Sequence, residues 1–138
     1  NVYTPQMIIN GKADVVGSRP MDVAKAVMNA RKRAMPVSVK TTPVAQGLLV
    51  SAASNGLQNG AYDLIAVAIK PKAEVQIKRG ENRGKTISYV NVVRDFKPIG
   101  RLSNGQARLT VPAIDGAKLA VFVQAQGQGP IVGAALQD

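Results

Sequence analysis

The sequence predicts an α+β chain that is mostly β, with a ββα segment over residues 1–35 followed by an antiparallel β-sandwich over residues 36–138. The first part carries two short apolar runs and one stretch of helical periodicity. The remainder is divided into short β-type runs by Gly, Asn and Pro. Because two strands and one helix cannot bury both faces of a sheet, we expect the first 35 residues to be half of a larger unit.

The ββα segment is predicted from a turn signal and a helical pattern. Residues 2–9 form a strand-like run, Asn10-Gly11 accepts the positive φ angles of a type I′ turn, and a second strand is expected at about 13–16. A helix is expected at about 19–34, with Ser18 as its N-cap. Its apolar positions recur at the spacing of one helical face: Val23, Val27, Ala30 and Ala34.

The sandwich is predicted from alternation and turns. Apolar and polar residues alternate most clearly at 74–78 and 118–124, as in strands with one buried face. The turns are Asn55-Gly56, Asn59-Gly60, Asn104-Gly105 and Asp115-Gly116. The expected strands are at about 37–42, 47–53, 62–69, 73–79, 86–96, 107–111, 118–125 and 130–136. Such strands make a self-contained sandwich of about 100 residues.

The composition excludes several classes of site. The 138 residues include no Cys, no His and no Trp. A zinc site, a disulfide framework and a Ser-His-Asp triad therefore cannot be built from this chain. Its eight carboxylate residues form no clear pair by spacing, as a two-carboxylate mechanism would need. We expect no metal, no cofactor and no catalytic residue here, which leaves open whether a longer parent protein is an enzyme.

The charge balance predicts an anionic partner. Eighteen Lys and Arg against eight Asp and Glu give a formal net charge of +10, which attracts phosphates, acidic proteins and anionic surfaces. Aromatic residues are only 4%, so the stacking platforms of nucleic-acid binders are poorly supplied. No run approaches the roughly 18–20 apolar residues that span a bilayer. We expect an acidic protein or a polyanion as partner and no membrane span, with a nucleic-acid-binding module as an alternative.

One glycine-rich segment, residues 79–86, carries several cations. Residues 80–86 end in Gly-Lys-Thr like a phosphate-binding loop, but three residues rather than four separate the glycines. Residues 87–93 are strand-like, whereas a phosphate-binding loop leads into a helix. The segment is either an exposed, solvated hairpin or a site for an anion or an acidic partner. The candidate residues of that site are Arg79, Arg83, Lys85 and Arg94.

Three segments resemble a family of secreted bacterial proteins of unknown function: residues 1–18, 79–86 and 91–94. In that family a thioredoxin-like domain precedes a β-rich C-terminal part, and the resemblance covers essentially the whole chain. It implies that the chain, which begins at Asn1 rather than Met, is the C-terminal portion of a longer protein in the periplasm or outside the cell. Residues 1–34 would then supply the last two strands and the helix of a thioredoxin-like sheet.

The resemblance also assigns a role to Thr4-Pro5. This dipeptide resembles the thioredoxin-type Thr-Pro segment, whose proline is typically cis and shapes the substrate groove beside the redox-active cysteines. A chain without cysteine cannot perform thiol-disulfide exchange by itself.

Two interpretations follow from the resemblance. The chain is a non-catalytic module that binds a partner or selects a substrate and packs on an upstream thioredoxin-like half. Alternatively, it is part of a thiol-disulfide oxidoreductase whose cysteines lie upstream. Unpaired strand edges within residues 2–16 also favour a homodimer.

Overall fold

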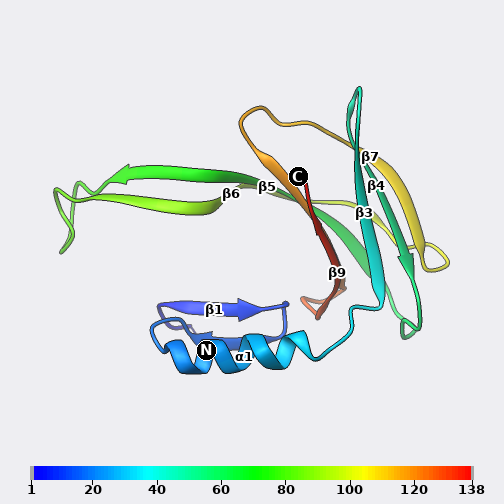
Figure 1. Cartoon of the computed structure of the whole chain (residues 1–138), viewed down its shortest axis with the longest axis horizontal. Coiled ribbons are helices and arrows are strands. Elements are labelled where there is room, and N and C mark those ends of the chain that lie inside the picture. The colour runs from blue at the N-terminus through cyan, green and yellow to red at the C-terminus, as the bar shows by residue number, and fades with distance from the viewer. Residues whose placement is uncertain (1, 138) are drawn as a thin grey trace.

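The computed structural model describes residues 2–137 as three antiparallel sheets and one short helix (Figure 1). Asn1 and Asp138, the outer ends of the two predicted domains, lie outside the described residues. The elements are β1 (Gln6–Ile9), β2 (Ala13–Val16), α1 (Pro20–Arg31), β3 (Val37–Val44), β4 (Gly47–Ser54), β5 (Tyr62–Gln76), β6 (Thr86–Arg101), β7 (Gln106–Pro112), β8 (Lys118–Ala125) and β9 (Ile131–Leu136).

Two sheets pack on each other and form the core. Their strand orders are β3-β4-β7 and β6-β5-β8-β9, and every neighbouring pair is antiparallel. Buried and less buried residues alternate along β4 and β8, because successive side chains of a strand point to opposite faces. The largest fully buried side chains are Leu48, Val50, Leu64, Leu119, Val121 and Val123. The mostly β prediction is confirmed.

The two sheets meet closely along one side only. There, Gly133 of β9 lies against Val37 of β3, and a Cβ at Gly133 would overlap the Val37 backbone. Along the other side, β6 leads into β7 through a tight turn in which Ser103 and Gln106 exchange backbone hydrogen bonds of 2.8 and 3.1 Å. Beyond this turn the two strands enter different sheets, so the sandwich is open between β6 and β7.

The β5–β6 pair extends well beyond the sandwich (Figure 1). β8 pairs with β5 only as far as Ile69, whereas β6 remains paired to Gln76. The two strands expected at 62–69 and 73–79 are therefore one strand, and that prediction was wrong. Pro71 does not end the strand, because β5 has a single neighbour there and a missing N–H is tolerated at such an edge. We call residues 70–92 the arm.

Residues 2–35 form a separate N-terminal unit, and the prediction of a thioredoxin-like half was wrong. β1 and β2 pair only with each other in the described chain, α1 packs on them, and no residue of α1 is buried. The Asn10-Gly11 turn closes the two strands locally, with φ angles of 50° and 70°. The expected order of strand, turn, strand and helix is correct, but it builds a small sheet of its own. The fold is thus mostly β, with three antiparallel sheets.

The helix is shorter than predicted. It spans Pro20–Arg31, and its N-cap is Arg19, which forms no side-chain capping bond. In the described chain, no helix is both long enough and apolar enough to cross a membrane.

The N-terminal unit is attached to the sandwich at the Asn10-Gly11 turn. The Ile131 N–H donates a hydrogen bond of 2.9 Å to the Asn10 carbonyl oxygen. A Cβ at Gly11 would lie 3.1 Å from the Gly129 oxygen and 3.2 Å from the Ile131 side chain. Because of these close contacts and its positive φ angle, position 11 favours glycine.

Candidate partner-binding surface

The arm has one apolar face and one polar face. The register pairs Val75 with Ile87 and Ala73 with Tyr89, which places these side chains on the same side of the ribbon. Val75 is 45% exposed and Tyr89 is 43% exposed. The residues between them point to the opposite, mostly polar face. It consists of Val90 and six polar residues: Lys70, Lys72, Glu74, Gln76, Thr86 and Ser88.

The apolar face continues onto the outer side of the four-stranded sheet. Ile69 pairs with Val93 and Val67 pairs with Phe96, so the same side of the ribbon stays apolar toward the sandwich. The Phe96 ring lies 5.9 Å from that of Phe122, centroid to centroid, at an interplanar angle of 50°. Val93 and Phe96 remain more than half exposed. We call Val75, Ile87 and Tyr89 of the arm, together with Val93 and Phe96 at its base, the arm face.

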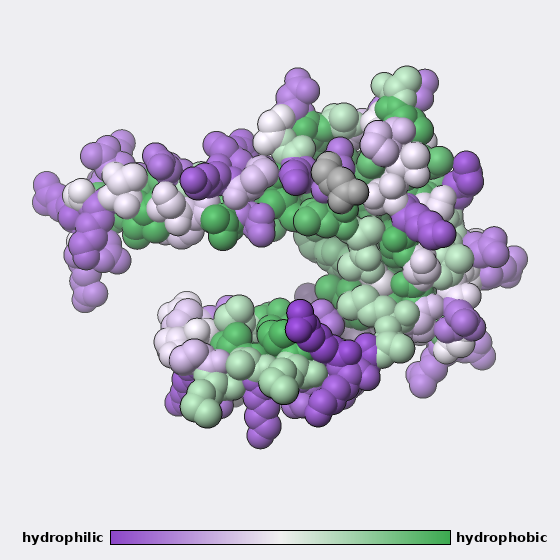
Figure 2. Space-filling view, in the orientation of Figure 1, coloured by the Kyte–Doolittle hydropathy of each residue, from purple (hydrophilic) through white to green (hydrophobic). Residues whose placement is uncertain are grey.

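The arm face borders a hollow in the molecule. Figure 2 shows apolar side chains along the side of the arm that faces the N-terminal unit, and the surface is concave between the two. The nearest strand of that unit exposes Met7 and Ile8, which are 40% and 55% exposed. Contiguous exposed apolar surface is a feature of many interaction sites, which makes this face the candidate binding surface of the chain.

The tip of the arm is an ordered loop that carries cations. The Ile77 N–H donates to the Lys85 oxygen (2.9 Å) and the Gly84 N–H donates to the Ile77 oxygen (2.8 Å). The Lys85 ammonium donates to Asn82 Oδ1 at 3.2 Å. Gly80 and Gly84 have φ angles of 86° and 82°, which glycine adopts without strain. The structure therefore brings three candidate residues together, all of them exposed: Arg79, Arg83 and Lys85.

Arg94 does not belong to this tip. It is the extra residue of a β-bulge, because Ala68 pairs with Asp95 and Ile69 with Val93. Eight strand positions separate it from Thr86, at about 3.3 Å each. Arg94 is exposed near the base of the arm, where it cannot share a single anionic group with the tip.

Thr4-Pro5 lies at the start of the N-terminal unit. The peptide bond is cis, as the resemblance implies, and the Pro5 oxygen accepts a hydrogen bond of 2.7 Å from the Gly17 N–H. Nearby, the Tyr3 hydroxyl donates to Asp14 Oδ2 at 2.8 Å. This hydrogen bond raises the pKa of Tyr3 above its ordinary value of 10.0.

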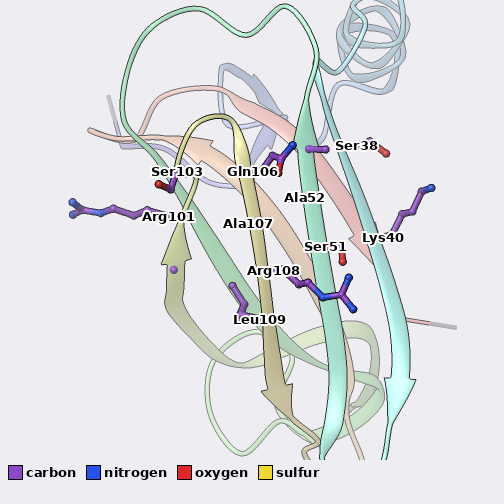
Figure 3. A pocket seen from close by; sticks show the side chains of 12 residues that line it. Ser38, Lys40, Ser51, Ala52, Arg101, Ser103, Gln106, Ala107, Arg108 and Leu109 are labelled. Carbon is purple, nitrogen blue, oxygen red and sulfur yellow. The ribbon is translucent and has the colours of Figure 1, made fainter.

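A second polar feature lies at the opposite end of the molecule from the arm. A groove of about 740 Å³ runs over the three-stranded sheet and reaches the end of β6 (Figure 3). Its polar lining consists of Ser38, Lys40, Ser51, Arg101, Ser103, Gln106 and Arg108. No motif or spacing in the sequence indicates this groove. The alternation of polar residues along 38–42 and 106–110 was its only signal.

Comparison with known proteins identifies the family. The profile described as "protein of unknown function (DUF1223)" matches residues 1–124. The chain belongs to this family. No curated protein matches the chain.

A solved structure shares the fold of this DUF1223 chain. A crystal structure of a structural-genomics target from Agrobacterium tumefaciens matches with a TM-score of 0.76 and 22% identity, over 99% of this chain and 62% of that one. This chain thus spans less than two thirds of that protein's length. At this identity the likeness shows the fold alone. The expected membership of a family of unknown function is confirmed, whereas a periplasmic or secreted location stays a prediction.

Proposed function

We propose that this DUF1223 chain is a non-catalytic module that binds an acidic partner protein through the arm. The observation that carries the proposal is the combination, on one projecting ribbon, of an exposed apolar face and a basic tip. The apolar face provides the area to bury, and Arg79, Arg83 and Lys85 provide the charge that selects the partner.

The arm is only weakly stabilised when no partner covers it. A two-stranded ribbon is marginally stable in water, and the arm has no third strand over Lys70–Gln76. Its apolar side chains are partly exposed to water, at a cost of about 25 cal/mol per Å² relative to burial. A partner that covers the arm face would remove this cost. Aromatic residues such as Tyr89 are frequent anchors in interfaces of this kind.

The test starts by finding the partner with a photo-crosslinking residue at Tyr89, followed by mass spectrometry and purification of the captured protein. Its affinity is then measured for the wild-type chain and for the triple variant Arg79→Glu, Arg83→Glu, Lys85→Glu. We expect an acidic protein and a loss of at least about tenfold in affinity, because reversed charges meet like charges on the partner.

The matched control reverses three cations on the N-terminal unit: Lys12→Glu, Lys25→Glu and Lys32→Glu. All three residues are exposed, so the net charge changes equally without touching the arm. The proposal requires the tip variant to lose much more affinity than this control. Equal losses would mean that only the net charge of the chain matters, and unchanged binding by the tip variant would refute the role of the tip.

A polyanion or a nucleic acid would be recognised differently. Binding to such a polymer depends steeply on salt, because each neutralised phosphate releases a counterion. Burial of an apolar face depends on salt only weakly. Strong heparin or RNA binding that disappears at moderate salt, with no effect of Tyr89 substitution, would favour the polymer over an acidic protein.

A further inference from the structure

The groove on the three-stranded sheet contains a row of polar side chains fixed by strand register. Lys40 of β3 is the direct partner of Ser51 of β4, and Ser51 is the direct partner of Arg108 of β7. Cross-strand partners point to the same face of a sheet, and this face is opposite to the one that buries Val50 and Ala52. Lys40, Ser51 and Arg108 therefore form one row across the outer face.

The row has the dimensions of an anion site. Neighbouring strands lie about 4.8 Å apart, so the backbones of β3 and β7 are separated by about 10 Å with Ser51 between them. In Figure 3, Arg108 extends from β7 toward Ser51, whereas the Lys40 side chain projects from β3 away from it and would have to turn inward to contact a group bound there. Both side chains are long enough to reach one group bound over Ser51. The next row along the sheet adds a hydroxyl and an amide, from Ser38 and Gln106.

The charges of this row are uncompensated. Within residues 2–137, no acidic residue lines the groove and neither Lys40 nor Arg108 takes part in an ion pair. Arg101 differs, because its Nε donates to Asp63 Oδ1 at 3.1 Å and its side chain points away from the row in Figure 3. The register thus places one unpaired cation on the strand at either side of the Ser51 hydroxyl, and two such cations can neutralise a tetrahedral oxyanion.

We propose that Lys40, Ser51 and Arg108 bind a phosphate or sulfate group, either as the free ion or as the terminal group of a small sugar ester. Arg108 would donate two N–H groups to it, Lys40 would add a point charge, and Ser51 would donate its hydroxyl. The absence of aromatic side chains from the groove lining argues against a nucleobase or a stacked ring as part of the ligand. Ser38 and Gln106 would contact the hydroxyls of an attached sugar. This site is independent of the arm.

The experiment is an NMR titration of the ¹⁵N-labelled chain with four probes: inorganic phosphate, sulfate, glucose 6-phosphate and glucose. We expect saturable shifts of the amides at residues 40, 51 and 108 with the anions and none with glucose. Tighter binding of glucose 6-phosphate than of phosphate would identify the sugar ester as the ligand class, and equal affinities would identify the free ion.

Two variants test whether Lys40 and Arg108 bind the anion. Lys40→Gln and Arg108→Gln should each weaken anion binding by about tenfold, since a charge-assisted hydrogen bond is lost in each case. The control variants Lys32→Gln and Arg33→Gln, on the N-terminal unit, should leave it unchanged. Absence of saturable shifts at these amides would overturn the proposal. Equal weakening by the control variants would also overturn it, because binding would then follow net charge.

Discussion

The sandwich and the arm share the strands β5 and β6 but differ in what they bury. Along Leu64–Ala68, β5 has a neighbour on each side and every residue is buried. Along Lys70–Gln76, the same strand has one neighbour and no residue is buried. This contrast indicates that stability is concentrated in one part of the strand pair, whereas the proposed recognition surface lies in the other. Substitutions should therefore separate the two properties.

The largest expected effect is on the stability of the sandwich. Leu64 is fully buried at the centre of β5, and Leu64→Ala removes its packing and leaves a cavity, which costs about 3 kcal/mol. Met21 of α1 is 85% exposed, and Met21→Ala should change stability by less than about 0.5 kcal/mol. Urea unfolding of both variants measures the difference. Similar free energies of unfolding would contradict the division into a buried core and an exposed N-terminal unit.

A smaller effect is expected on partner affinity from the arm. Tyr89→Ser removes an aromatic side chain from the arm face and should weaken binding of the captured partner by about tenfold. Val90→Ser is the matched control, because Val90 is the next residue, is 70% exposed and points to the polar face. Affinity for both variants can be measured by calorimetry. A larger loss with Val90→Ser would place the binding surface on the other face of the ribbon.

The smallest effect concerns Tyr3. Its pKa is raised in the folded chain by the hydrogen bond to Asp14, so its contribution to stability is complete below pH 10.0 and is lost as pH rises through the raised pKa. Tyr3→Phe should therefore be slightly less stable than the wild type near neutral pH, and the difference should disappear at high pH. Urea midpoints of the two proteins across this range measure it. A difference that grows with pH would contradict the assignment.

The sequence predicted features that depend on neighbours in the chain. Asn10-Gly11 and Asn104-Gly105 have the expected positive φ angles, and the tip of the arm follows directly from Gly80 and Gly84 between two β-type runs. Because its cations lie within seven residues of one another, the local turn is sufficient to bring them together.

Features that depend on distant pairing were not predictable. Pro71 lies between the two strands expected at 62–69 and 73–79. A proline is tolerated inside a strand where that strand has an unpaired edge, and the sequence does not show where β8 stops pairing with β5. Arg94 was grouped with the cations of the tip, and its place near the base of the arm was missed. That place is fixed by a bulge that depends on how β5 and β6 pair, which the sequence does not show. The groove requires Lys40, Ser51 and Arg108 to be aligned across three strands, and no spacing along the chain indicates that alignment. The N-terminal unit was wrongly assigned to a thioredoxin-like sheet. Its order of strand, turn, strand and helix occurs both in a small independent sheet and as part of a larger one.

The strongest test of the arm as the recognition element is the affinity of the previously captured partner for a chain without the arm, measured by calorimetry. Lys70 and Val92 are direct cross-strand partners, so residues 71–91 can be replaced by Asn-Gly, the preferred two-residue hairpin turn. We predict that this variant unfolds in urea with a free energy within about 1 kcal/mol of the wild type, since no core residue is removed, and that it does not bind the purified partner. A shortened chain that folds and still binds the purified partner with wild-type affinity would contradict the proposal that recognition belongs to the arm.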